Sequence, residues 1–174
     1  MHLSLKAPLE ACEKTRRELL AVFARAAPEI WETRLDGQGW SLAEQLDHLI
    51  RAEVGTSKMA RKLIRGDFRG VARSHDASLF DSTLHSYPYG RLPAPAPLVP
   101  SRLPFEDARP QLVATHERFL EELGRFGGPD ADGLAAPDPD TGVWFTLGGW
   151  VRVQALHEAH HISQIRALLA RLTR

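Results

Sequence analysis

The sequence has a single cysteine, no excess of charge of either sign and no long hydrophobic run. Cys12 has no partner for a disulfide within the chain, which is typical of a reducing compartment. The 22 basic and 22 acidic residues give a formal net charge of zero, so the composition favours neither nucleic acid nor an anionic membrane as a partner. Residues 1–10 lack the apolar core of a secretion signal, and no segment reaches the ~18 apolar residues of a membrane span. We therefore expect a cytoplasmic protein.

Four amphipathic segments dominate the 174-residue sequence, of which 43% is hydrophobic. They repeat apolar residues at helical spacing over Pro8–Ala26, Ser41–Arg65, Phe105–Phe126 and Thr146–Leu172. Ser41 and Glu44 form a capping box at the start of the second segment. No strand pair and no internal repeat stands out. The pattern predicts an all-α fold, a four-helix bundle that occupies residues 1–174 as a single domain.

The second and third predicted helices are joined by a long connection, Gly66–Pro104, that contains six prolines. Such a length of chain easily spans a helix of ~35 Å. It therefore allows the second and third helices to run parallel, which predicts an up-down-down-up bundle with a long crossover. Tyr87 and Tyr89 in the crossover, and Trp144 before the last helix, are candidate walls of a substrate pocket.

His157 and His161 lie four residues apart on the apolar face of the last predicted helix. Two imidazoles at this spacing can bind one divalent metal ion from a single rigid element. The alternative is a pair of hydrogen-bonded core histidines, but buried polar side chains need partners, and a metal supplies one to both. His160 lies at the edge of this face, and we interpret it as a structural or supporting residue rather than a ligand.

The stretch His157-Glu158-x-x-His161 also matches the H-E-x-x-H pattern of zinc metalloproteases, with Glu158 as the general base. Those enzymes need a third ligand downstream. The residues that follow, 162–174, contain no His, Asp or Glu, and the sequence predicts no sheet along which a peptide could align. These features argue against a metalloprotease.

The residues alone leave the third metal ligand open. Catalytic zinc sites generally use three protein ligands and keep one position for water, and bundle cores often build such sites from facing helices. His48 lies two turns into the second predicted helix, where a surface or capping role is the plain alternative. His116 lies on the third helix, and His2, His75 and His85 lie in the N-terminal tail or the crossover.

Three motifs follow one another along the chain: Trp40-Ser41-x-x-Glu44-x-x-x-His48-Leu49, Gly148-x-Trp150, and His157-x-x-His160-His161-x-x-Gln164-Ile165. Their order and spacing resemble the DinB/YfiT-like superfamily of metalloenzymes. The resemblance implies the up-down-down-up bundle, a homodimer, and a zinc or nickel site made by His48, His157 and His161. Members include thiol S-transferases that use bacillithiol or mycothiol. Some members replace the first histidine of the C-terminal pair by Glu, so His157 does not point to the mycothiol-dependent isomerases.

A three-histidine site leaves Zn²⁺ or Ni²⁺ with its full positive charge and an open position, where the pKa of a bound thiol or water falls toward neutrality. We expect a metal-dependent transferase that activates a low-molecular-weight thiol for attack on an electrophilic small molecule. A metal-dependent hydrolase of a small substrate, or a non-catalytic metal-containing stress-response binding protein, is the alternative.

Two carboxylates are further candidates for the site. Glu53 falls on the buried stripe of the second predicted helix, where it needs an arginine or a histidine N–H as partner. An ion pair at a helix junction is the structural alternative for Glu53. Glu158 lies off the centre of its stripe, so we expect an exposed side chain that is free to act as a general base.

Overall fold

The computed structural model describes residues 3–35, 39–66, 87, 93–101, 103–126, 135–139 and 142–173. In these ranges the chain forms four long helices: α1 (Leu3–Phe23), α2 (Leu42–Arg65), α4 (Phe105–Gly124) and α5 (Leu147–Leu172). Two short 3₁₀ helices, η1 (Pro28–Ile30) and η3 (Ala96–Leu98), lie in the connections. The predicted all-α four-helix bundle is confirmed.

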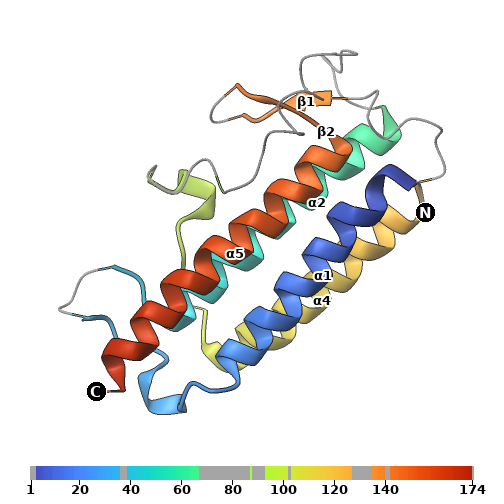
Figure 1. Ribbon diagram of the computed structural model, residues 1–174. Coiled ribbons are helices and arrows are strands. Elements are labelled where there is room, and N and C mark those ends of the chain that lie inside the picture. Colours follow the sequence, from blue (N-terminus) through green and yellow to red (C-terminus); the bar gives the residue numbers. More distant parts are fainter. Residues whose placement is uncertain are drawn as a thin grey trace.

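The helices run in the predicted up-down-down-up order (Figure 1). Helices α1 and α5 point in one direction, while α2 and α4 point in the other and are parallel to each other. Helix α2 packs against both α4 and α5, and α1 packs against α5. Because α2 and α4 are parallel, the chain between them must return along the bundle before α4 begins. Most of this crossover lies outside the described residues.

The helix ends follow local chemistry. Ser41 and Glu44 form the predicted capping box at the start of α2, and Gly66 ends the helix at φ 67°, a left-handed conformation that favours glycine. Helix α1 begins at Leu3 rather than at Pro8, which lies inside the helix. Leu5 is fully buried and extends the apolar stripe one turn before Leu9, so the first turn is stabilised by packing despite the proline.

A two-stranded antiparallel sheet, which the sequence pattern did not predict, precedes α5. Strand β1 (Ala135–Pro137) pairs with β2 (Trp144–Thr146). Three residues are too few to show alternation, and Ala-Ala-Pro has low strand propensity, so the sequence carries little signal here. The last residue of β2 is also the N-cap of α5, where the Thr146 hydroxyl accepts a hydrogen bond from Gly149 N. The sheet therefore fixes where α5 starts.

Two apolar clusters fill the two ends of the bundle. One cluster lies near the sheet and includes Phe119, Leu123 and Phe145, and the other lies near the opposite end and includes Leu19, Leu46 and Ile165. The middle of the bundle holds buried polar side chains from all four helices: Arg16, His48, Glu53, His116, Gln154, His157, Glu158 and His161. Since buried polar groups are costly, this layer is where a functional site is expected.

Candidate metal centre

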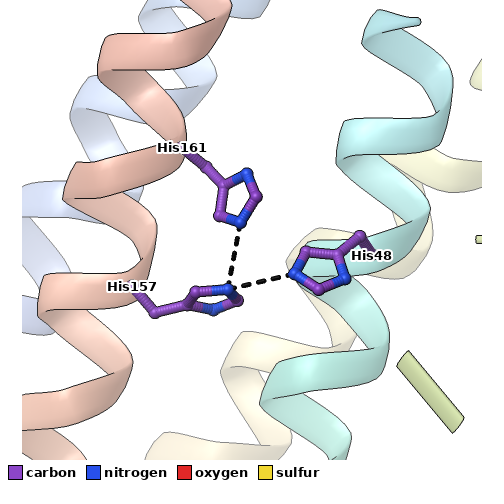
Figure 2. Close-up of side chains that lie close together, drawn as sticks. All are labelled: His48, His157 and His161. Carbon is purple, nitrogen blue, oxygen red and sulfur yellow. Dashed lines mark hydrogen bonds between the residues drawn. The ribbon is translucent and has the colours of Figure 1, made fainter. Parts of the chain in front are cut away.

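His48 on α2 meets His157 and His161 on α5 inside the bundle (Figure 2). The Nε2 atom of His157 lies 3.0 Å from Nε2 of His48 and 3.0 Å from Nε2 of His161. The three residues are only 4%, 5% and 5% exposed, in sequence order. The structure thus brings together all three of the predicted ligands.

The outer nitrogens of two of these rings are held by oxygen acceptors. His48 Nδ1 lies 2.8 Å from the carbonyl oxygen of Leu98, at the end of η3, and His161 Nδ1 lies 2.5 Å from Oε1 of Gln45 on α2. A carbonyl or amide oxygen can only accept, so both Nδ1 atoms donate a proton. In the neutral rings, both Nε2 atoms then carry a lone pair that points inward.

The inward lone pairs of His48 and His161 cannot both accept a hydrogen bond within the cluster. The His157 Nε2 position can donate its single proton to His48 or to His161, but not to both. Ligand nitrogens of a tetrahedral ion bound at 2.0–2.1 Å would stand roughly 3.3 Å apart, close to the spacing seen here. A divalent cation accepts all three lone pairs at once, so the donor set fits such an ion.

The pKa values of the three histidines favour metal ligation. Burial is the main cause that lowers the pKa of each ring, and burial together with the neighbouring imidazoles brings the pKa of His161 to about 3. The neighbouring imidazoles lower the pKa of His157 and His161 further, because each would repel a second positive charge. All three side chains are therefore neutral at physiological pH, and neutral imidazole is the form that binds metal.

Two aromatic residues lie against the histidines. The ring centroid of Trp40 is 4.7 Å from that of His48, and the ring centroid of Tyr87 is 4.7 Å from that of His157. Tyr87 comes from the crossover, so a predicted pocket residue lies beside the site. Tyr89 lies outside the described residues, and Trp144 pairs with Pro137 in the sheet.

His160 does not join the cluster of Nε2 atoms. Its side chain is half-buried, and its Nε2 lies 2.9 Å from Nε2 of Gln164, an exposed residue one turn further along α5. His160 therefore lies outside the cluster, and its role as a structural or supporting residue stays a prediction.

A buried ion-pair network lies on the side of α5 that faces α1. Arg16 on α1 donates two hydrogen bonds to Glu158 and, at 2.8 Å, one to Glu53 Oε2. A further hydrogen bond goes from Arg16 to the carbonyl oxygen of Leu112 at 2.7 Å. His116 Nδ1 lies 2.7 Å from the other Glu53 oxygen. Glu53 therefore has both of its predicted kinds of partner, an arginine and a histidine.

The prediction that Glu158 is exposed is wrong. Its side chain is 1% exposed, because α5 is covered by α1 as well as by α2. The apolar stripe read from the sequence of α5 is centred on the side that faces α2, so it does not indicate the second covered face. Burial raises the pKa of Glu158, while Arg16 opposes the shift. The hydrogen bonds of Glu158 go to Arg16 and Thr15, so a general-base role for Glu158 or Glu53 stays a prediction.

Sequence reasoning missed three groups around the site: Gln45, the carbonyl of Leu98 and Arg16. Two of them carry a readable signal. Gln45 lies one helical turn before His48, and Arg16 is the charged position in an apolar stripe that runs through Leu9, Cys12 and Leu19. The Leu98 carbonyl belongs to an irregular segment, whose path no periodicity predicts.

A cavity of about 440 Å³ opens at the start of α2, away from the histidines. Its lining residues come from the segment before α2, the first turn of α2 and the segment before α4, namely Glu32, Arg34, Ser41, Ala43, Glu44, Ser101, Leu103 and Pro104. Several of these side chains already pair with one another, Arg34 with Glu44 among them. We assign no chemistry to this cavity.

Comparison with known proteins identifies the family of this chain and finds its fold in solved structures. The model of the DinB superfamily matches residues 11–165. YfiT from Bacillus subtilis, described as a probable metal-dependent hydrolase with an unusual four-helix bundle topology, is 18% identical at a TM-score of 0.64, over 96% of this chain and 86% of its own. The four-helix bundle protein TT2238 is 21% identical at a TM-score of 0.63, over 94% and 98%. No curated protein matches the chain. Among the described residues, no helix is long and apolar enough to cross a membrane.

Proposed function

Because this chain belongs to the DinB superfamily, we propose that His48, His157 and His161 bind a divalent metal ion, Zn²⁺ or Ni²⁺, and that the protein is a metal-dependent enzyme. The observation that carries the proposal is the convergence of three Nε2 atoms in a buried, neutral cluster, with 3.0 Å between neighbouring nitrogens. A purely structural histidine cluster would pair each lone pair with a donor, and this one leaves a lone pair unpaired.

A bound divalent ion would supply a Lewis acid that lowers the pKa of a thiol or a water molecule. The residues of the chain hold this chemistry in place. Gln45 and the Leu98 carbonyl fix the tautomer and orientation of two rings, and Trp40 and Tyr87 pack against the rings of His48 and His157.

Our first candidate activity is transfer of a low-molecular-weight thiol to an electrophilic small molecule. The sulfur would bond to the electrophilic carbon, a leaving group such as chloride would depart, and the thiol proton would pass to solvent. Cys12 is a poor nucleophile, because its thiol is buried, donates a hydrogen bond to the Val151 carbonyl and has a pKa that burial raises. The sulfur would therefore come from a co-substrate. The sequence resemblance to a superfamily whose members include thiol transferases supports this candidate.

A second candidate is hydrolysis of a small substrate, with water in place of the thiol. The similarity in fold to YfiT, described as a probable metal-dependent hydrolase, favours it. The same histidine cluster would serve both reactions, so the choice between them rests on the co-substrate.

The test is conjugation of monochlorobimane with bacillithiol, mycothiol or glutathione, by protein loaded with Zn²⁺ or Ni²⁺ and by the same protein after chelation. We expect a metal-dependent rate above background with at least one thiol. Parallel assays with p-nitrophenyl esters test the hydrolase. Loss of the rate in His157→Ala, with the rate kept in His160→Ala, would tie either activity to the cluster. Background rates in every assay would leave a metal-containing binding protein and reject the enzyme.

A further inference from the structure

Two buried donors on α5 have no hydrogen-bond partner among the residues that the structure describes. Within the part of the chain that the structure describes, only three buried polar side-chain atoms lack one: His116 Nε2, Trp150 Nε1 and Gln154 Nε2. Trp150 and Gln154 are 6% and 2% exposed, and they lie four residues apart, so they share one face of α5. Unpaired buried N–H groups are costly and rare, so a pair of them on one helix face needs an explanation.

The amide oxygen of Gln154 faces the Thr56 hydroxyl on α2. The Thr56 hydroxyl on α2 lies 3.1 Å from Gln154 Oε1 and 3.1 Å from the Ala52 carbonyl. The hydroxyl carries one proton, which it can give to Gln154 Oε1 or to the Ala52 carbonyl. With Oε1 turned toward Thr56, the NH₂ side of the amide has no partner among the described residues. It is available to an acceptor that the described chain does not supply.

The two donors lie on the same stripe as the histidines. Trp150, Gln154, His157 and His161 follow one another at spacings of four, three and four residues. With 1.5 Å of rise per residue, Gln154 lies roughly 4.5 Å and Trp150 roughly 10.5 Å from His157 along the axis of α5. A group that bridges the two donors would therefore lie within the length of a small substrate from the histidine cluster.

The facing side of α2 has small residues at this level. Ala52, Gly55 and Thr56 follow His48 on that helix, and Gly55 lies seven residues after His48, on the same face. A Cβ at Gly55 would meet no atom within 4 Å. Gly55 is half-buried, and no described residue fills the space directly beside it, so this level of α2 leaves room for a ligand.

We infer that Trp150 Nε1–H and Gln154 Nε2–H form a subsite that binds a carbonyl or amide oxygen of the substrate, beside the histidine cluster. Both groups are neutral and only donate, so they suit an oxygen that only accepts. A carboxylate would be buried without a counter-charge from this pair, since Arg16 is already bound to Glu53 and Glu158. The inference rests on the proposed function, because its occupant is the substrate of that centre.

The test follows the indole N–H signals of metal-free, ¹⁵N-labelled protein by NMR during titration with N-acetylcysteamine, which carries an amide oxygen a few bonds from its thiol. Trp150→Phe identifies the Trp150 signal. We expect this signal to move downfield and to saturate with a dissociation constant on the order of 1 mM. 1-Butanethiol, which has no carbonyl, should leave it in place.

The matched variants are Gln154→Leu and Gln164→Leu, the same change at a buried and at an exposed position of α5. Loss of one hydrogen bond should weaken binding about two- to tenfold in Gln154→Leu, and Gln164→Leu should bind as wild type does. An unmoved Trp150 signal, an equal response to 1-butanethiol, or unchanged affinity in a folded Gln154→Leu would overturn the subsite. The titration uses no metal, so protein that binds no metal but keeps the indole response rejects the proposed function alone.

Discussion

Gln45 on α2 accepts a hydrogen bond from Nδ1 of His161 on α5, with 2.5 Å between the two atoms. It lies one turn before His48, so a single stretch of α2 supplies both a candidate ligand and the group that orients another. This contact fixes which nitrogen of His161 carries the proton, and hence which one faces the other two histidines.

Changing Gln45 to Leu should weaken metal binding without removing a ligand. The ring of His161 would lose its orientation and its fixed tautomer, and we expect affinity to fall roughly 10- to 100-fold. Competition with a chromophoric chelator measures the change. Gln111→Leu, an equivalent change at an exposed position on α4, is the control. Equal affinities in Gln45→Leu and wild type would show that this hydrogen bond does not orient a ligand.

Changing Arg16 to Met should destabilise the fold strongly. The variant would leave Glu53 and Glu158 buried without their shared cation, and such a loss costs about 3–5 kcal/mol. Urea denaturation at neutral pH measures the free energy of unfolding. Arg17→Met, on the exposed side of α1, should stay within about 0.5 kcal/mol of wild type. Similar values for the two variants would mean that the network contributes little.

The free energy of unfolding should depend on pH through Glu158. Burial raises the pKa of its carboxyl group, so the folded state holds this proton to higher pH than the unfolded chain does. Stability from this group therefore falls as pH rises from the usual glutamate value through the raised one. Glu158→Gln removes that loss, so its stability relative to wild type should improve with rising pH across this window. A difference that is flat or of opposite slope contradicts the shift.

The thiol of Cys12 should be inert in the native protein. It is buried, donates to the Val151 carbonyl and has a pKa that burial raises, so little thiolate forms and no reagent reaches it. We expect no reaction with Ellman's reagent at pH 8 until urea unfolds the chain. Glu13→Cys, one residue along on the exposed face of α1, should react at once as a positive control. Rapid reaction of the native wild-type protein would show that Cys12 is accessible and reactive, and would make it a candidate nucleophile.

The sequence predicts the four helices and their order because their signals are local. Ser41 and Glu44 cap α2, and the spacing of His157 and His161 places both on one face of α5. The burial of Glu158 is not local: it depends on Arg16, about 140 residues earlier, and on α1 covering a second face of α5. The sheet before α5 is formed by neighbouring segments, but its strands are too short to show a pattern in the sequence.

The choice of the third metal ligand also depends on contacts between distant parts of the chain. Periodicity alone leaves His48 and His116 as rivals, because each lies on a helix that faces the core. The family resemblance selects His48, and in the structure His116 pairs with Glu53 instead. The choice depends on how α2 and α4 are rotated in the bundle, which one sequence does not specify.

The central claim is the three-histidine metal site, and elemental analysis of purified protein tests it most directly. Wild type should carry about one equivalent of Zn²⁺ or Ni²⁺ per chain, as should His160→Ala. Single changes of His48, His157 or His161 to Ala should each reduce the bound metal sharply, with the fold checked by circular dichroism. A folded His48→Ala protein that keeps a full equivalent of metal would contradict the account.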